Sequence, residues 1–317
     1  MLFKPVDIYS ALFPVHFVCK FLGLAPNRTK ENELGFKYFY SSDTDILYNV
    51  CIVFLTLSST VCLHEYILST LPKTTIGLLN NLLCLYSLSA IALSSSTLPL
   101  IRRETYNCFL NDICYTNVLM SKSSIIVCYK NVYLYSILFI FQIIFEFISM
   151  WSTYYFADEY PNCHALKYAH LFVVPDIIES AMLGMFQILV ILLKINIESL
   201  NCYLENLMLN KRHDCSSRSE CRKLQEIVRI LSTVQCKLIE NARTLNEIFS
   251  LQILFWILLY AASAISKFYY IVYACFISKD IEYNLLWGFA IFCIFWDNMR
   301  IFTCVIVCRN FSTQVFV

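Results

Sequence analysis

The longest polar stretch of the chain runs from Lys194 to Phe249 and reads KINIESLNCYLENLMLNKRHDCSSRSECRKLQEIVRILSTVQCKLIENARTLNEIF. It carries nine of the 24 Lys and Arg residues. Four long apolar segments precede it and two follow it. A basic loop between membrane spans stays on the cytoplasmic side, because Lys and Arg resist translocation. The side on which this loop lies therefore sets the orientation of every other span.

The composition of the whole chain is that of a membrane protein. Of its 317 residues, 58% are apolar and 15% are charged, and the mean hydropathy is +0.61. A soluble domain is about half apolar and a quarter charged. Several segments exceed the ~18 apolar residues that indicate a membrane span. The sequence predicts an all-α, polytopic helical membrane protein, and its net charge of +1 gives no reason to expect a nucleic-acid partner.

Six membrane spans are expected from the apolar segments. They cover residues 47–68, 76–101, 132–155, 169–193, 251–277 and 285–307. The chain then divides into a cytoplasmic arm (1–46), spans 1 to 4 (47–193), a cytoplasmic helical loop (194–250), spans 5 and 6 (251–307) and a C-terminal stub (308–317). Residues 102–131 are expected to form a polar connector, and residues 8–24 to lie in the membrane interface.

The long loop has a helical period of its own. Its apolar residues recur at steps of three and four, which is typical of an amphipathic helix. They are Leu224, Val228, Leu231, Leu238, Ala242, Leu245 and Phe249. We expect this helix to continue without a break into span 5. It either packs on its own neighbours or forms a bundle between subunits, and the period does not separate these two possibilities.

The distribution of Lys and Arg gives an orientation. From the arm to the connector after span 5, the segments contain five, one, four, one, nine and one of them. The richer side is cytoplasmic, so both the N-terminus and the end of span 6 are expected inside the cell. This orientation excludes a G-protein-coupled receptor, whose N-terminus lies outside.

Catalysis, metal binding and a disulfide scaffold are not expected. Most of the 16 cysteines lie in expected spans or cytosolic loops, where disulfides are rare. There is no HExxH, no GxSxG and no Gly-rich phosphate loop, and the chain has five glycines. The sequence predicts no cofactor.

Ionisable residues inside the expected spans are candidate functional residues, because a charge in a bilayer is costly. They are Glu146, Asp176, Glu179, Lys267, Asp297 and Arg300. Glu146, Glu179 and Lys267 are expected about 20–25 Å from the cytoplasmic ends of their helices, so Lys267 could pair with either acid. Asp297 and Arg300 are three residues apart and can pair on one helix face. These groups either fix the register of the helices or take part in ligand binding and gating.

Aromatic residues gather in the outer half of the same spans. The candidate ligand-binding set combines five aromatic residues with three of the charged ones: Trp151, Tyr154, Phe172, Tyr270 and Tyr273, with Asp176, Glu179 and Lys267. An apolar pocket with a few polar groups is typical of small-molecule sites. An interfacial aromatic girdle is the alternative interpretation, and it is favoured for Trp151 and Tyr154.

The N-terminal arm contains PVDIYSALFP at residues 5–14 and GLAP at residues 23–26. This opening resembles that of insect gustatory receptors, especially those of ants, bees and wasps. The inside N-terminus, the long basic loop between spans 4 and 5, and the entry of span 6 into Cys304 and Cys308 are also similar to that family. The resemblance covers the layout of the whole chain and is specific in letters only at the N-terminus.

The resemblance implies a ligand-gated, non-selective cation channel that assembles as a homo- or hetero-tetramer. It also implies a small-molecule tastant as ligand and the plasma membrane of sensory neurons as the location. A seventh, pore-lining helix of the family, with a Thr-Tyr…Gln-Phe signature, has no counterpart here. We therefore expect either a truncated sequence or a non-conducting subunit. The alternatives are an odorant receptor of the same superfamily and, more remotely, a membrane transporter.

Overall fold

The computed structural model describes residues 7–25, 27–31, 37–70, 75–158, 165–210, 218–276 and 281–315. Eight helices and one short hairpin make up these ranges: α1 (Ile8–Phe21), β1 (Arg28–Glu31), β2 (Lys37–Tyr40), α2 (Asp43–Thr70), α3 (Thr75–Ile101), α4 (Arg103–Lys122), α5 (Lys130–Asp158), α6 (Ala165–Asn210), α7 (Arg218–Phe276) and α8 (Ile281–Val315).

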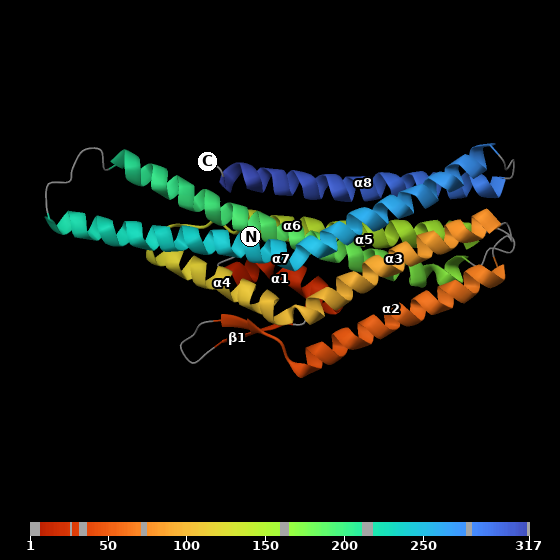
Figure 1. Ribbon diagram of the computed structural model, residues 1–317, viewed down its shortest axis with the longest axis horizontal. Coiled ribbons are helices and arrows are strands. Elements are labelled where there is room, and N and C mark those ends of the chain that lie inside the picture. Colours follow the sequence, from red (N-terminus) through yellow and green to blue (C-terminus); the bar gives the residue numbers. More distant parts are fainter. Residues whose placement is uncertain are drawn as a thin grey trace.

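The long helices lie side by side in an elongated bundle and alternate in direction (Figure 1). The C-terminal ends of α2, α5 and α7 meet the N-terminal ends of α3, α6 and α8 at one end of the bundle. The hairpin, α4, the second half of α6 and the first half of α7 occupy the other half.

Within the described residues, four helices are long and apolar enough to cross a membrane: Asp43–Glu65, Lys130–Ser152, Val173–Met208 and Gln225–Tyr269. They correspond to expected spans 1, 3, 4 and 5. The chain is therefore compatible with a helical membrane protein. Expected spans 2 and 6 are helical in α3 and α8, where several outer side chains fall outside the described residues. Six crossings and the orientation stay predictions.

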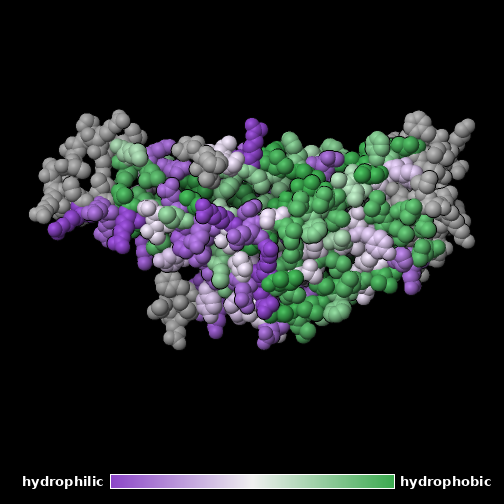
Figure 2. Space-filling model, in the orientation of Figure 1, coloured by the Kyte–Doolittle hydropathy of each residue, from purple (hydrophilic) through white to green (hydrophobic). Residues whose placement is uncertain are grey.

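The surface divides along the length of the bundle. Apolar residues cover the half that contains the expected spans, and hydrophilic residues cover much of the half that contains α4 and the start of α7 (Figure 2). The spans differ in how far they are enclosed, since 83% of the α6 window is buried but only 17% of the α2 window. Helix α6 is therefore the central helix of the bundle, and α2 presents most of its surface to the surroundings.

Helix α7 confirms the expected continuity between the amphipathic loop helix and span 5, because it runs unbroken over 59 residues. Leu231, Leu238 and Leu245 are buried, and this half of α7 packs against α4, within its own chain. At the start of the apolar half, the ring of Phe249 lies 5.1 Å from that of Phe186 on α6. The second part of the apolar face, from Leu231 to Phe249, thus packs on neighbours in the same chain, whereas Val228 is 51% exposed. A bundle between subunits stays a prediction.

The expected polar connector at residues 102–131 contains a helix that was not expected from the sequence. Helix α4 occupies residues 103–122 and buries Tyr106, Phe109, Leu110 and Ile113. The polar residues of α4 other than Thr116 are exposed or half-buried, so its average composition concealed an amphipathic helix.

The described chain is almost entirely helical, in agreement with the expected all-α class, and its one sheet is a short antiparallel pair formed by β1 and β2. The side chain of Asn111 on α4 forms hydrogen bonds with the main chain of β2, as a neighbouring strand would. Its side-chain amide donates to the Phe39 carbonyl at 3.0 Å, and its Oδ1 accepts from the Phe39 N–H at 2.7 Å. Arg28 of β1 makes a two-pronged contact with Asp45 at the start of α2, at 2.7 and 3.0 Å. Side chains from α2 and α4 therefore hold a hairpin whose first strand is wholly exposed.

Helix α1 begins with a capping box. The Asp7 carboxylate accepts from the Ser10 N–H at 2.8 Å, and the Ser10 hydroxyl oxygen accepts from the Asp7 N–H at 3.2 Å. One face of the helix is buried against α5 and α6, whereas Phe13, Phe17 and Phe21 are exposed on another. The exposed aromatic face is consistent with the interfacial position expected for this segment, which stays a prediction.

Candidate functional site

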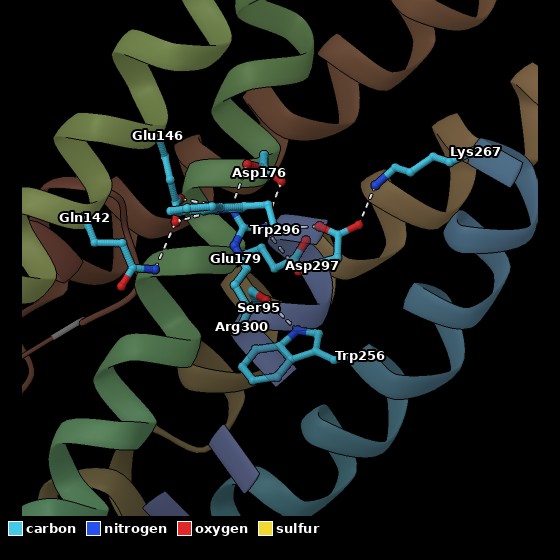
Figure 3. A network of polar contacts seen from close by, with 10 residues as sticks. All are labelled: Ser95, Gln142, Glu146, Asp176, Glu179, Trp256, Lys267, Trp296, Asp297 and Arg300. Atoms are coloured by element: carbon cyan, nitrogen blue, oxygen red, sulfur yellow. Dashed lines mark hydrogen bonds and ion pairs between the residues drawn. The ribbon is translucent and has the colours of Figure 1, made fainter. Parts of the chain in front are cut away.

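The centre of the candidate site is Arg300 of α8, which is 3% exposed. Its guanidinium donates to Asp176 of α6 through both terminal nitrogens, at 3.0 Å to Oδ1 and 2.9 Å to Oδ2. The nitrogen that donates to Oδ2 is Nη2, and it also donates to Glu146 Oε2 on α5 at 2.9 Å. A forked arginine contact is geometrically specific and stronger than a neutral hydrogen bond. One side chain therefore joins three helices inside the apolar half of the bundle (Figure 3).

Glu146 accepts from three different donors. Besides Arg300, the indole N–H of Trp296 on α8 and the side-chain amide of Gln142 both donate to its Oε1, each at 2.9 Å. Gln142 precedes Glu146 by one helical turn on α5, so its amide reaches the carboxylate from the same face. These three contacts satisfy both oxygens of a carboxylate that is almost fully buried.

A second ion pair extends the site to α7. Lys267 Nζ lies 2.5 Å from Asp297 Oδ2 on α8. Asp297 Oδ1 is also 3.8 Å from Arg300 Nη1. Because Asp297 faces both cations, the pair on α7 and α8 is linked to the group on α5 and α6. The site thus connects the four consecutive helices α5 to α8.

The charges in this site do not balance. Four carboxylates, those of Glu146, Asp176, Glu179 and Asp297, face two cations, Arg300 and Lys267. Glu179 is the least engaged of the four. Its Oε1 is buried without a hydrogen-bond partner and lies 4.0 Å from Arg300 Nη1. The site therefore holds two more acidic than basic groups, and an uncompensated buried charge is costly.

The structure brings all six predicted charged residues into one network, but it corrects their pairing. The expected partners of Lys267 were Glu146 and Glu179, but the structure pairs Lys267 with Asp297. Asp297 and Arg300 do face each other on one helix, yet the closest acids to Arg300 are Asp176 and Glu146 on other helices. Depth along a helix was the basis of the expected pairing, and depth does not fix the rotation of a helix about its axis.

The predicted aromatic pocket is described only in part. Trp151 is 39% exposed and stacks on Phe147, at 6.0 Å between ring centroids, which fits the girdle interpretation. The side chains of Tyr154, Phe172, Tyr270 and Tyr273 lie outside the described residues. The ligand-binding role of these residues stays a prediction.

Sequence reasoning missed two tryptophans that complete the polar contacts. Trp296 donates to Glu146 as above. Trp256 of α7 donates its indole N–H to Ser95 Oγ of α3 at 3.2 Å, and both side chains are buried. The available signal was residue type, because a buried tryptophan N–H needs an acceptor. Trp296 also lies next to Asp297 in the sequence, which is a second signal for its contact with the acidic residues.

In the described part of the chain, no three His, Cys, Asp or Glu side chains come together so that they could hold a metal ion. The network is thus a set of hydrogen-bonded ion pairs between helices. No family model matches the chain, and no curated protein matches it either.

Proposed function

We propose that this chain is a membrane receptor subunit of the insect gustatory type, in which a small-molecule tastant controls a non-selective cation pore. The observation that carries the proposal is the buried network of Arg300, which ties α5, α6, α7 and α8 together inside the apolar half. Ionisable residues inside a bilayer are rare, and they mark ligand and ion pathways as well as ion pairs that fix helix register. The resemblance of the N-terminal arm to that family supplies the class of receptor and its location in the plasma membrane of sensory neurons.

Helix α7 offers a physical route from a ligand to the far half of the molecule. It carries Lys267 in the apolar half and continues unbroken to Arg218. At the junction of its two halves, the guanidinium of Arg102 donates to the main-chain carbonyls of Glu247 and Ile248. A ligand that binds one arrangement of α7 and α8 more tightly shifts the population toward it. That shift would move the far half of α7 relative to α4, where a pore-forming assembly of four subunits could respond.

A transporter is less well supported than a receptor. Transporters bind their substrates where membrane helices are interrupted. Helix α6 passes through Pro175 as one helix from Ala165 to Asn210. An odorant receptor of the same superfamily remains the nearest alternative, and the class of ligand would separate it from a gustatory receptor.

The test is calcium imaging in cells that express the full chain, alone and together with candidate partner subunits, against sugars, amino acids, alkaloids and volatile odorants. We expect a tastant-dependent calcium entry that the Lys267→Met variant alters while reaching the cell surface. Lys237→Met is the matched control, because Lys237 pairs with Glu240 on the hydrophilic half of α7. Surface-expressed chain that shows no ligand-dependent calcium entry in any combination would contradict the proposal. A response restricted to volatile odorants would favour the odorant alternative.

A further inference from the structure

Helix α8 has an outward face that no other described element covers. The helix lies along one edge of the bundle (Figure 1) and packs mainly on α6 and α7. On the opposite side, exposed side chains recur at steps of four, three, four and three residues: Ile291, Phe295, Asn298, Phe302 and Val305. We call these five residues the α8 seam, and its four apolar members are between 44% and 60% exposed. This period is typical of a helix that packs along a second helix, although an apolar face in a bilayer can also meet lipid.

The α8 seam contains one polar side chain, Asn298, near the middle of expected span 6 (residues 285–307). Its amide donates to the Ile294 carbonyl at 2.7 Å, one turn earlier on the same helix. Among the described residues, this hydrogen bond is the one that its side chain makes, and it stays within α8. Hydrocarbon offers no partner to an amide, so an exposed amide is unfavourable there. Contact with lipid therefore accounts for the apolar members of the seam but not for Asn298.

The other Asn and Gln side chains that the structure describes in the expected spans are placed differently. Gln142 and Gln187 each donate to a second side chain, at 2.9 and 3.2 Å. Asn49 and Gln252 are buried, at 1% and 0% exposure. Of these five amides, Asn298 is thus the one that is exposed and has no side-chain partner among the described residues. Its position calls for a partner outside this copy of the chain.

The partner that suits an asparagine amide best is a second asparagine amide, because each has both a donor and an acceptor. A twofold axis between two copies of α8 would bring Asn298 opposite Asn298, so that each side chain donates to the other. Phe295 and Phe302 lie about one turn to either side and would pack around the two amides. Helices in membranes associate through close packing and such interhelical hydrogen bonds, and a single Asn in an apolar seam fixes the register of the pair. This self-complementarity favours a second copy over an unrelated helix.

We propose that the α8 seam is a contact between two copies of this chain in the membrane, with the two Asn298 amides hydrogen-bonded to each other at its centre. The two helices are parallel, because both copies have the same orientation in the bilayer. Each copy keeps its Arg300 network on the inner side of α8, facing its own bundle. The inference rests on expected span 6 lying in the bilayer. It goes beyond the receptor function, since such a pair needs neither a ligand nor a pore.

The place of the contact is measured first, with the full-length chain in lipid bilayers. A photoreactive benzophenone amino acid replaces Phe295 or Phe302, and the illuminated chain is separated on a denaturing gel. Phe141 of α5 is the matched control, because it is also an exposed phenylalanine, at 64%. Counted from the cytoplasmic ends of the expected spans, its depth lies between those of the two seam residues. We expect covalent dimers from both seam positions and none from Phe141. The absence of dimers at the seam positions, or an equal yield at Phe141, overturns the proposal.

The role of Asn298 is measured by energy transfer between donor-labelled and acceptor-labelled chains while the ratio of protein to lipid is varied. We expect Asn298→Leu to weaken the association by about 5- to 30-fold and Asn298→Gln, which keeps an amide, to retain most of it. Ser58→Leu is the matched control, because Ser58 is an exposed polar residue near the middle of expected span 1, and it should leave the association unchanged. Equal association of the wild type and Asn298→Leu, or an equal loss with Ser58→Leu, contradicts the proposed contact. A wild-type chain that stays monomeric at every ratio shows that the seam meets lipid or water, and it overturns the proposal.

Discussion

Two buried glutamates of the Arg300 network allow a test in which the chemical change is the same and the expected results differ. Glu146→Gln and Glu179→Gln each replace one carboxylate by an amide of nearly the same size. Both side chains are almost fully buried, at 2% and 1% exposure. Glu146 accepts from Arg300, Trp296 and Gln142, each at 2.9 Å. Glu179 Oε1 accepts no hydrogen bond.

The magnitude follows from these contacts. Glu146→Gln removes the charge that faces Arg300 and turns an amide N–H₂ toward at least one former donor. A hydrogen bond to a charged group contributes about 1.5–3 kcal/mol. We therefore expect Glu146→Gln to lower the folding stability by about 2–4 kcal/mol, which is near the cost of removing one partner of a buried ion pair. Glu179→Gln removes one of the two surplus carboxylates and no hydrogen bond at Oε1. We expect it to change stability by less than about 1 kcal/mol, in either direction.

The assay is thermal unfolding of the detergent-solubilised full-length chain, followed by size-exclusion chromatography with fluorescence detection. A stability change of 1 kcal/mol shifts Tm by about 2–4 °C in chains of 150–250 residues. We therefore expect Glu146→Gln to melt about 5–10 °C below the wild type and Glu179→Gln to melt close to it. Equal losses in the two variants, or a wild-type Tm for Glu146→Gln, would refute the assignment of Glu146 as the acid that accounts for the stability of the network.

Three further predictions concern the packing and the N-terminal arm. Gly184→Ala should destabilise the chain by about 1–3 kcal/mol or more, because a Cβ there would fall on the ring of Phe139; Phe139→Leu in the same chain should recover part of the lost Tm. Burial lowers the pKa of His16 below its unfolded value of about 6.5. At a pH below about 6.5 the unfolded state therefore binds more protons than the folded state, so stability should fall as the pH falls. A His16→Gln variant, compared with the wild type by melting between pH 5 and 7.5, should lose this dependence of stability on pH. Asp7→Ala should cost about 1 kcal/mol through loss of the cap of α1, and Asp7→Asn should retain most of the stability in the same melting assay.

The fold was predictable from the sequence to the extent that its signals are local. Hydropathy located the apolar helices, and the three-and-four-residue period of the loop predicted the first half of α7 and its continuity with the second. The helix within the expected connector at 102–131 was missed because the average polarity of the segment conceals the apolar face of α4, which includes Phe109 and Ile113. The hairpin was not predictable from its own residues, since β1 has no buried side chain. Asp45 of α2 holds Arg28 of β1, and Asn111 of α4 holds Phe39 of β2.

The sequence by itself determined which residues could form the candidate site, because charged residues stand out in apolar segments. It named Glu146, Asp176, Glu179, Lys267 and Arg300 before any contact was known, together with Asp297. The tertiary structure alone decided that Arg300 forks onto Asp176 and that Lys267 faces Asp297. The physical reason is that ion pairing between helices depends on their rotation and tilt. Those are set by side-chain packing along the whole length of α6 and its neighbours, and no single segment carries that information.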